Sequence, residues 1–209
     1  MAVSVVKAAS GLGVAAATVG GGIFVAKGME GSPSTPKSTV QDKLKQNGYS
    51  PLDLEKSDGW SEVLEAYNQH KNNPSIRFDH GDREISEQEL KDACSSAFNS
   101  DDKYENAKRW CVVPYSVSQV LTSKSLKVLN VNDTGDDDQD DQDEWDNLKG
   151  QYQENAIPGL VLKSTEDWQS LRTKCKELVE KKPWSDGYED SISHATRWCT
   201  HAFVNNSDS

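Results

Sequence analysis

A five-residue pattern that occurs twice constrains the fold of this chain more than any other feature. The pattern is Ala-x-Arg-Trp-Cys, found from Ala107 to Cys111 and again from Ala195 to Cys199. The whole chain has only 6 Trp and 4 Cys, so chance is a poor explanation for both recurring in the same order. We therefore predict a duplicated structural unit.

Matching residues also precede each copy of the pattern. Each copy follows an earlier Cys and, further back, a Trp-x-x-apolar-x-x-x-Tyr segment, whose spacing places all three side chains on one face of a helix. Large aromatic residues at such positions are typical of a core, and we prefer this interpretation to a ligand-binding cage. The predicted core residues of the repeat are Trp60, Tyr67, Trp110, Trp145, Tyr152 and Trp198.

Capping signals predict that most of the chain is helical. Thr39 is placed to cap a helix that ends near Asn47, a second helix is expected from Ser57, and Ser86 with Glu89 forms a capping box. We expect residues 117–131 to form a helix that docks on the first unit, with a strand at 126–131 as the alternative.

Helix starts are also predicted for the last helix of the first unit and for the last two helices of the second unit. Ser100 to Asp102 would cap a short helix that runs to the first Trp-Cys pair, and Ser164 to Asp167 would open a helix through Trp168. Ser185 or Asp186 would start the last helix.

Each unit has two cysteines, one in each of its last two predicted helices. If the helices form a hairpin, Cys94 meets Cys111 and Cys175 meets Cys199. Closing loops of about 18 to 25 residues would then contribute roughly 3 kcal/mol each, in an oxidising compartment. Buried free thiols are the alternative. A metal site is disfavoured, because no C-x-x-C exists and Cys199-x-His201 with His194 lacks a recognisable fourth ligand.

The amino-terminal segment is a candidate membrane anchor. From Ala8 to Ala26 no residue is charged, and a helix of this length would span about 28 Å, close to the thickness of a bilayer's hydrocarbon core. A cleaved signal peptide and a surface-lying or soluble helix are the alternatives. Small residues recur at every fourth position, which allows weak self-association of such helices, although an Ala/Gly-rich segment produces this pattern by accident as well. These residues are Ala9, Gly13, Ala17 and Gly21.

Two polar segments are expected to be linkers. Residues 28–38 are rich in Gly, Ser and Pro, and residues 132–144 are dominated by carboxylates without a base. Alternate acids from Asp136 superficially suggest a calcium loop, but Asp141 occupies the sixth position, where a calcium loop requires Gly.

Charge and missing motifs exclude several functions. The net charge is −11, which repels phosphate backbones, so we expect no nucleic-acid partner. We identify no phosphate-binding glycine loop and no hydrolase or zinc-protease motif. The four histidines show no motif that assembles a catalytic base: His70, His80, His194 and His201. We therefore predict no catalytic residues, no cofactor and no metal, and treat an enzyme as the third hypothesis.

Several stretches together resemble a known group of proteins. These are the Ala/Gly-rich amino terminus, Lys-Leu-Lys-x-x-Gly-Tyr from Lys43 to Tyr49, the Trp-led helix, and Arg-Trp-Cys-Val-Val-Pro from Arg109 to Pro114. They resemble the paralogous families of short membrane-anchored proteins of haemotropic mycoplasmas. The resemblance implies surface display and antigenic variation, and it transfers no catalytic residue.

The sequence thus predicts a mainly α protein: an N-terminal transmembrane helix, then two related small helical units with Trp/Cys core positions, joined by an acidic linker. The predicted parts are an anchor at 1–27, a linker at 28–38, a first unit at 39–131, an acidic linker at 132–144, a second unit at 145–204 and a tail at 205–209. We expect a single-pass membrane protein with its bulk outside the cell, acting as a binding or antigenic module with a protein partner. A membrane-tethered cytoplasmic scaffold is the alternative, and the lysines after the leader permit it.

Overall fold

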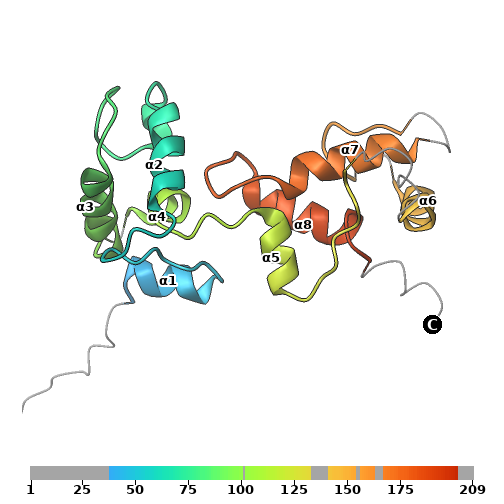
Figure 1. The fold of residues 1–209 in the computed structure, drawn as a ribbon, viewed down its shortest axis with the longest axis horizontal. Coiled ribbons are helices and arrows are strands. Elements are labelled where there is room, and N and C mark those ends of the chain that lie inside the picture. Colours follow the sequence, from blue (N-terminus) through green and yellow to red (C-terminus); the bar gives the residue numbers. More distant parts are fainter. Residues whose placement is uncertain (1–37, 101, 133–140, 154–155, 163–166, 202–209) are drawn as a thin grey trace, which may run out of the picture. The chain divides into compact units, whose positions relative to one another are not determined.

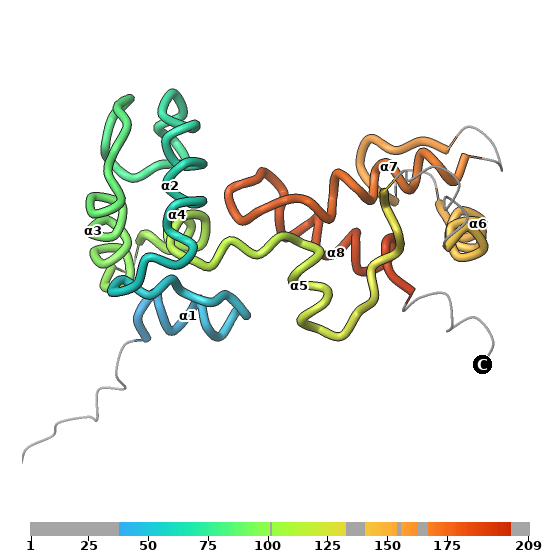
Figure 2. Tube along the Cα trace, in the orientation of Figure 1, coloured from blue at the N-terminus to red at the C-terminus, as the bar shows by residue number. Residues whose placement is uncertain are grey.

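The computed structural model describes residues 38–100, 102–132, 141–153, 156–162 and 167–201, and within these ranges the chain is mainly α-helical (Figures 1 and 2). Pairing of extended backbone between distant segments is confined, in the described ranges, to two isolated bridges. The α-helices are α1 (Val40–Gln46), α2 (Trp60–Gln69), α3 (Glu87–Phe98), α4 (Tyr104–Trp110), α5 (Val117–Ser123), α6 (Gln142–Gln151), α7 (Trp168–Val179) and α8 (Tyr188–Trp198), with a 3₁₀ turn, η1, at Pro74–Ile76.

The apolar side chains gather into two cores. The first core is built from α1 to α4, and the second is built from α5 to α8 (Figure 1). Val117, Leu121 and Leu129 all belong to the second core, so the prediction that residues 117–131 dock on the first unit is wrong. The helical spacing correctly identified the buried face of α5 but carried no information on which core it would join.

With α5 placed in the second core, the two units match from their first residue. Thr39 caps α1 and Ser116 caps α5, each through a capping box. Both helices end in a turn with positive φ, at Gly48 and Ser125. The backbone N–H that follows each turn donates back to the helix, from Tyr49 to Leu44 at 2.9 Å and from Leu126 to Leu121 at 3.0 Å. The duplication therefore includes α1 and α5.

The start and the end of each unit are joined by the same backbone pairing. The N–H of Leu52 donates to the carbonyl of Cys111 at 2.9 Å, and the N–H of Leu129 donates to Cys199 at 3.0 Å. The residues beside these bonds form the two isolated bridges, Pro51 with Val112 and Val128 with Thr200. The strand considered at 126–131 is therefore a single bridge, and it ties the segment after α5 to the end of α8.

The predicted helix starts differ from the observed ones in detail. The capping box of Ser86 and Glu89 is present at α3. The helix expected from Ser57 begins at Trp60, after Gly59, whose φ of +82° stops the helix from extending backwards. Lys103, rather than Ser100 to Asp102, precedes α4 and makes no side-chain cap, while Gly187 precedes α8.

Several predicted segments lie outside the described residues. These are the candidate anchor with its small-residue face, the linker up to residue 37, most of the acidic linker, the predicted helix start at 164–166 and the tail. Across the described ranges, no helix combines the length and apolarity needed to cross a bilayer.

Candidate functional site

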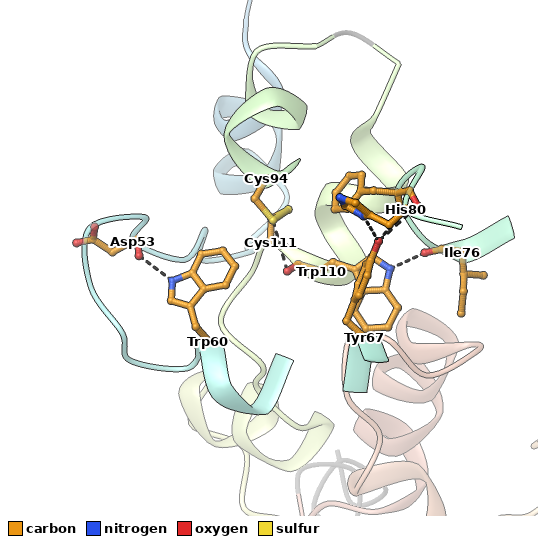
Figure 3. Close-up of a disulfide and its surroundings, with 9 residues drawn as sticks. Asp53, Trp60, Tyr67, Ile76, His80, Cys94, Trp110 and Cys111 are labelled. Atoms are coloured by element: carbon orange, nitrogen blue, oxygen red, sulfur yellow. Dashed lines mark hydrogen bonds between the residues drawn. A yellow bond between two sulfur atoms is a disulfide. The ribbon is translucent and has the colours of Figure 1, made fainter. Parts of the chain in front are cut away.

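The predicted core residues of the first unit surround its disulfide (Figure 3). Cys94 of α3 is bonded to Cys111, which follows α4. Trp60, Tyr67 and Trp110 are fully buried, and the Tyr67 and Trp110 rings meet edge to face with centroids 5.0 Å apart. The Trp60 indole donates to the carbonyl of Asp53 at 2.9 Å, and that of Trp110 donates to Ile76. These aromatic residues fill a core and line no cage.

The second unit repeats this arrangement with its own residues. Cys175 of α7 is bonded to Cys199, which follows α8. Tyr152 meets Trp198 edge to face, again with centroids 5.0 Å apart, and Trp145 is fully buried. All four cysteines are therefore in disulfides, with the pairing that treats both units alike, and none is left as a thiol nucleophile.

The tyrosine hydroxyl performs the same structural task in both units. Tyr67 Oη accepts the N–H of Phe78 at 3.0 Å, and Tyr152 Oη accepts the N–H of Ile157 at 2.9 Å. Tyr152 Oη also lies 3.2 Å from the carbonyl of Leu160, to which it donates. Each hydroxyl thus fastens the loop that follows its helix to the core.

Two histidines have clear structural partners in the first unit. His80 Nδ1 lies 2.8 Å from the Tyr67 hydroxyl, and His70 Nδ1 lies 2.8 Å from the carbonyl of Ala66. Burial, followed by the nearby charges of Arg83 and Arg77, lowers the pKa of His80, which favours its neutral form. These contacts identify His80 as part of the tyrosine-anchored loop.

An apolar cavity is formed by both units together. It has a volume of about 220 Å³. Its lining comes from the segment after α1, the segment that joins the two units, α5, and the first turns of α8. The apolar and aromatic side chains of the wall are Tyr49, Val113, Tyr115, Val120, Pro183, Tyr188 and Ile192.

One carboxylate, Glu189, belongs to the lining, and it is held from two sides. Tyr49 Oη donates to Glu189 Oε1 at 2.7 Å, and Lys108 Nζ lies 2.7 Å from the same oxygen. Burial opposes ionisation of Glu189, but the hydrogen bonds from Lys108 and Tyr49 outweigh it, so the pKa of this carboxyl is lowered. Glu189 is therefore ionised at neutral pH.

Two tyrosines of the wall, Tyr49 and Tyr188, are neutral hydrogen-bond donors. Burial, followed by the hydrogen bond to Glu189, raises the pKa of Tyr49, and burial followed by the charge of Glu189 raises the pKa of Tyr188 to about 12. Tyr188 Oη donates to the carbonyl of Tyr115 at 2.8 Å, while the Tyr115 side chain itself is 44% exposed. The cavity thus has aromatic walls and two charged lining residues, Glu189 and Lys124.

Contacts between the units hold the cavity together. The Trp110 and Trp184 rings stack with an interplanar angle of 6° and centroids 6.3 Å apart. Lys182 Nζ donates to the carbonyl of Pro114 at 2.8 Å and pairs with Glu62 at 3.0 Å. Within the second unit, the N–H of Val117, the first residue of α5, donates to the carbonyl of Lys181 at 3.0 Å. The wall of the cavity therefore rests on a defined packing of one unit against the other.

Comparison of the chain with models of protein families, with curated proteins and with solved structures finds no match in any of the three.

The sequence predicted none of the cavity residues as a site. Tyr49 and Glu189 are separated by 140 residues and belong to different units, so no local motif connects them. The available signal was Tyr49 itself, an aromatic residue just after a helix-ending glycine, in a stretch that drew attention only through the family resemblance.

Proposed function

We propose that this protein is a membrane-anchored binding module without catalytic activity, and that the cavity between its two units accepts a protein ligand. The observation that carries the proposal is the cavity wall itself. It needs Tyr49 from the first unit and Tyr188 from the second, and it combines apolar surface with the carboxylate of Glu189. Binding sites commonly have this composition, with a few polar groups among apolar walls.

The size of the cavity suits one anchoring side chain. A volume of about 220 Å³ is below the range of about 300 to 1,000 Å³ that is usual for pockets that enclose a whole small molecule. Protein interfaces, in contrast, commonly depend on a single large side chain inserted into a pocket. An apolar anchor residue of a partner protein is therefore the occupant we propose.

Charge indicates what should flank the anchor residue. The net charge of the chain is −11, so its long-range field attracts basic ligands, although Glu189 is paired with Lys108 and Lys124 also lines the cavity. Basic residues beside the apolar anchor would accelerate association and orient the ligand, because the charges of the two surfaces are complementary.

The proposed location is outside the cytoplasm. Two disulfides in a chain of this size suit an oxidising compartment, and the uncharged segment from Ala8 to Ala26 would tether the module. The resemblance to surface-displayed mycoplasma families supports a host-facing or antigenic role. A tethered cytoplasmic scaffold is the second candidate, which the lysines that follow the leader permit.

Two experiments test this function with the full chain. Protease treatment of intact cells, followed by mass mapping of the cysteines, should remove the region after Ser38 and find both pairs oxidised. Protection of the region with four free thiols would instead establish the cytoplasmic scaffold.

The ligand is tested by selecting displayed random peptides on the full chain. We expect enrichment of peptides with one large apolar residue flanked by Lys or Arg, and loss of their binding in Val120→Trp, which fills the cavity. Val161→Trp is the matched control, because Val161 is 51% exposed and lies outside the cavity lining. Selected peptides that bind Val120→Trp as well as the wild type would refute the cavity as the site.

A further inference from the structure

Three metal-ligating side chains meet at one end of the second unit. Asp141 precedes α6, Glu144 lies in the first turn of α6, and His201 follows the disulfide at the end of α8. One donor atom from each residue can be chosen so that all three lie within 4.8 Å of one another. The sequence separates His201 from the two acids by most of helices α6 to α8, which is why its spacing predicted no metal site.

The backbone holds two of these residues in place before any ligand binds. Asp141 Oδ2 accepts the N–H of Asn130 at 2.7 Å, which leaves Oδ1 directed to His201. The N–H of His201 donates to the carbonyl of Lys127 at 3.0 Å, and the neighbouring Thr200 forms the bridge with Val128. The positions of Asp141 and His201 are therefore fixed by hydrogen bonds to residues 127–130, the segment that pairs with the end of the unit.

The imidazole of His201 has a buried nitrogen atom without a hydrogen-bond partner in the described residues. Its Nε2 atom is shielded from solvent and makes no hydrogen bond within the described ranges, although it approaches Asp141 Oδ1 at 3.2 Å. Its Nδ1 atom lies 3.8 Å from Glu144 Oε1. A buried polar atom without a hydrogen bond is costly, and a cation that accepts the nitrogen lone pair and faces both carboxylates would remove that cost.

The first unit shows that the fold does not require this cluster. Val113 is the counterpart of His201, since its N–H donates to Ser50 just as His201 donates to Lys127. Aligning Trp60 with Trp145 places Lys56 and Gly59 at the positions of the two acids. The first unit therefore builds the same closure with no ligating side chain at any of the three positions.

We propose that Asp141, Glu144 and His201 bind one transition-metal dication, with Zn²⁺ as the best fit to the donors. Zinc takes imidazole nitrogen and carboxylate oxygen at about 2.0 to 2.2 Å, and three protein ligands leave its fourth position to water or to a partner's side chain. Donor atoms around such an ion are about 3.4 Å apart in a tetrahedron, so donor atoms now within 4.8 Å of one another would approach by up to about 1.4 Å on binding. Calcium takes oxygen ligands only, so it is a poor alternative.

The test is a titration of the full, metal-free chain with Zn²⁺, followed by competition with Ca²⁺. We expect one Zn²⁺ per chain, no displacement by a hundredfold excess of Ca²⁺, and affinity reduced at least tenfold in both Asp141→Asn and His201→Ala. His194→Ala, which changes a histidine of α8 outside the cluster, should bind as the wild type does. Glu144→Gln provides a further variant if either of the others fails to fold, as judged by near-ultraviolet circular dichroism.

Two outcomes would overturn the proposal. Zinc affinity unchanged in the folded cluster variants would place the ion elsewhere in the chain. Displacement by Ca²⁺ at comparable concentration would mean that carboxylates alone, without the imidazole, hold the cation.

Discussion

Replacing both cysteines of one disulfide with alanine should destabilise the protein by nearly the same amount in either unit. The bonded residues are 17 apart in the first unit and 24 apart in the second. Loop-closure entropy in the unfolded chain gives about 3.1 and about 3.4 kcal/mol for loops of these lengths. The two values differ little because the entropy depends on the logarithm of the loop length. We therefore expect Cys94→Ala/Cys111→Ala and Cys175→Ala/Cys199→Ala to have similar stabilities.

Urea unfolding of the full chain, followed by tryptophan fluorescence, measures this loss. With an m-value of about 2 kcal/mol/M, a loss of about 3 kcal/mol lowers the midpoint by about 1.5 M. Alanine is a suitable replacement because all four cysteines are buried and a small apolar side chain introduces no unpaired polar group. Adding a reductant to each variant is the control, since only the disulfide that remains should respond.

A midpoint shift below about 0.5 M for either variant would refute this reasoning, because it corresponds to about 1 kcal/mol. It would mean that the packing of the unit, rather than the covalent bond, limits the freedom of the unfolded chain. A loss in one unit twice that in the other would likewise contradict an origin in loop length.

Three further predictions concern single residues. Tyr67→Phe and Tyr152→Phe should each cost about 1 to 3 kcal/mol, measured by urea unfolding, because each leaves a loop N–H without its acceptor. Leu121→Ala should cost about 2 to 5 kcal/mol and lower hydrogen-exchange protection in α7 and α8 more than in α1 to α4, since Leu121 belongs to the second core. The hydrogen bond from Arg83, followed by those of the capping box, lowers the pKa of Glu89 from 4.5 to about 2. The stabilising effect of its carboxylate should therefore be present above pH 4.5 and lost as the pH falls toward 2. Unfolding measured across this range should show a flatter pH dependence in Glu89→Gln, and an unchanged slope would contradict the assignment.

The end of each unit was predictable and its beginning was not, for a physical reason. Trp110 and Trp198 occupy the same position against a tyrosine in both cores. Such tightly packed sites accept few residue types, so the repeat is recognisable as identical residues in the sequence. Helices α1 and α5 need only a capping hydroxyl and two apolar residues. Many sequences meet that requirement, so the two helices share chemistry with few identical residues.

The residues of the cavity and of the metal-ligating cluster could not be predicted from the sequence for a different reason. Glu189 is one of many surface carboxylates in the sequence, and only the folded chain shows that Tyr49 and Lys108 hold it at a cavity. Sequence spacing connects His201 only with nearby residues such as Cys199 and His194, whereas its acidic neighbours in the structure come from the start of α6. Local spacing predicts helices well, but it gives no information about contacts between residues far apart in the chain.

The duplication supplies an internal comparison that separates what the fold needs from what it does not. Where the fold needs a residue, the units agree: a capping hydroxyl, a positive-φ turn, a loop-binding tyrosine and a disulfide. The units differ at the residues with chemistry of their own. Tyr49, which donates to Glu189, corresponds to Leu126, and His201 corresponds to Val113. The same backbone positions are filled without these polar groups in the other unit, so the fold of a single unit does not require them. They are therefore the residues at which binding should be sought first.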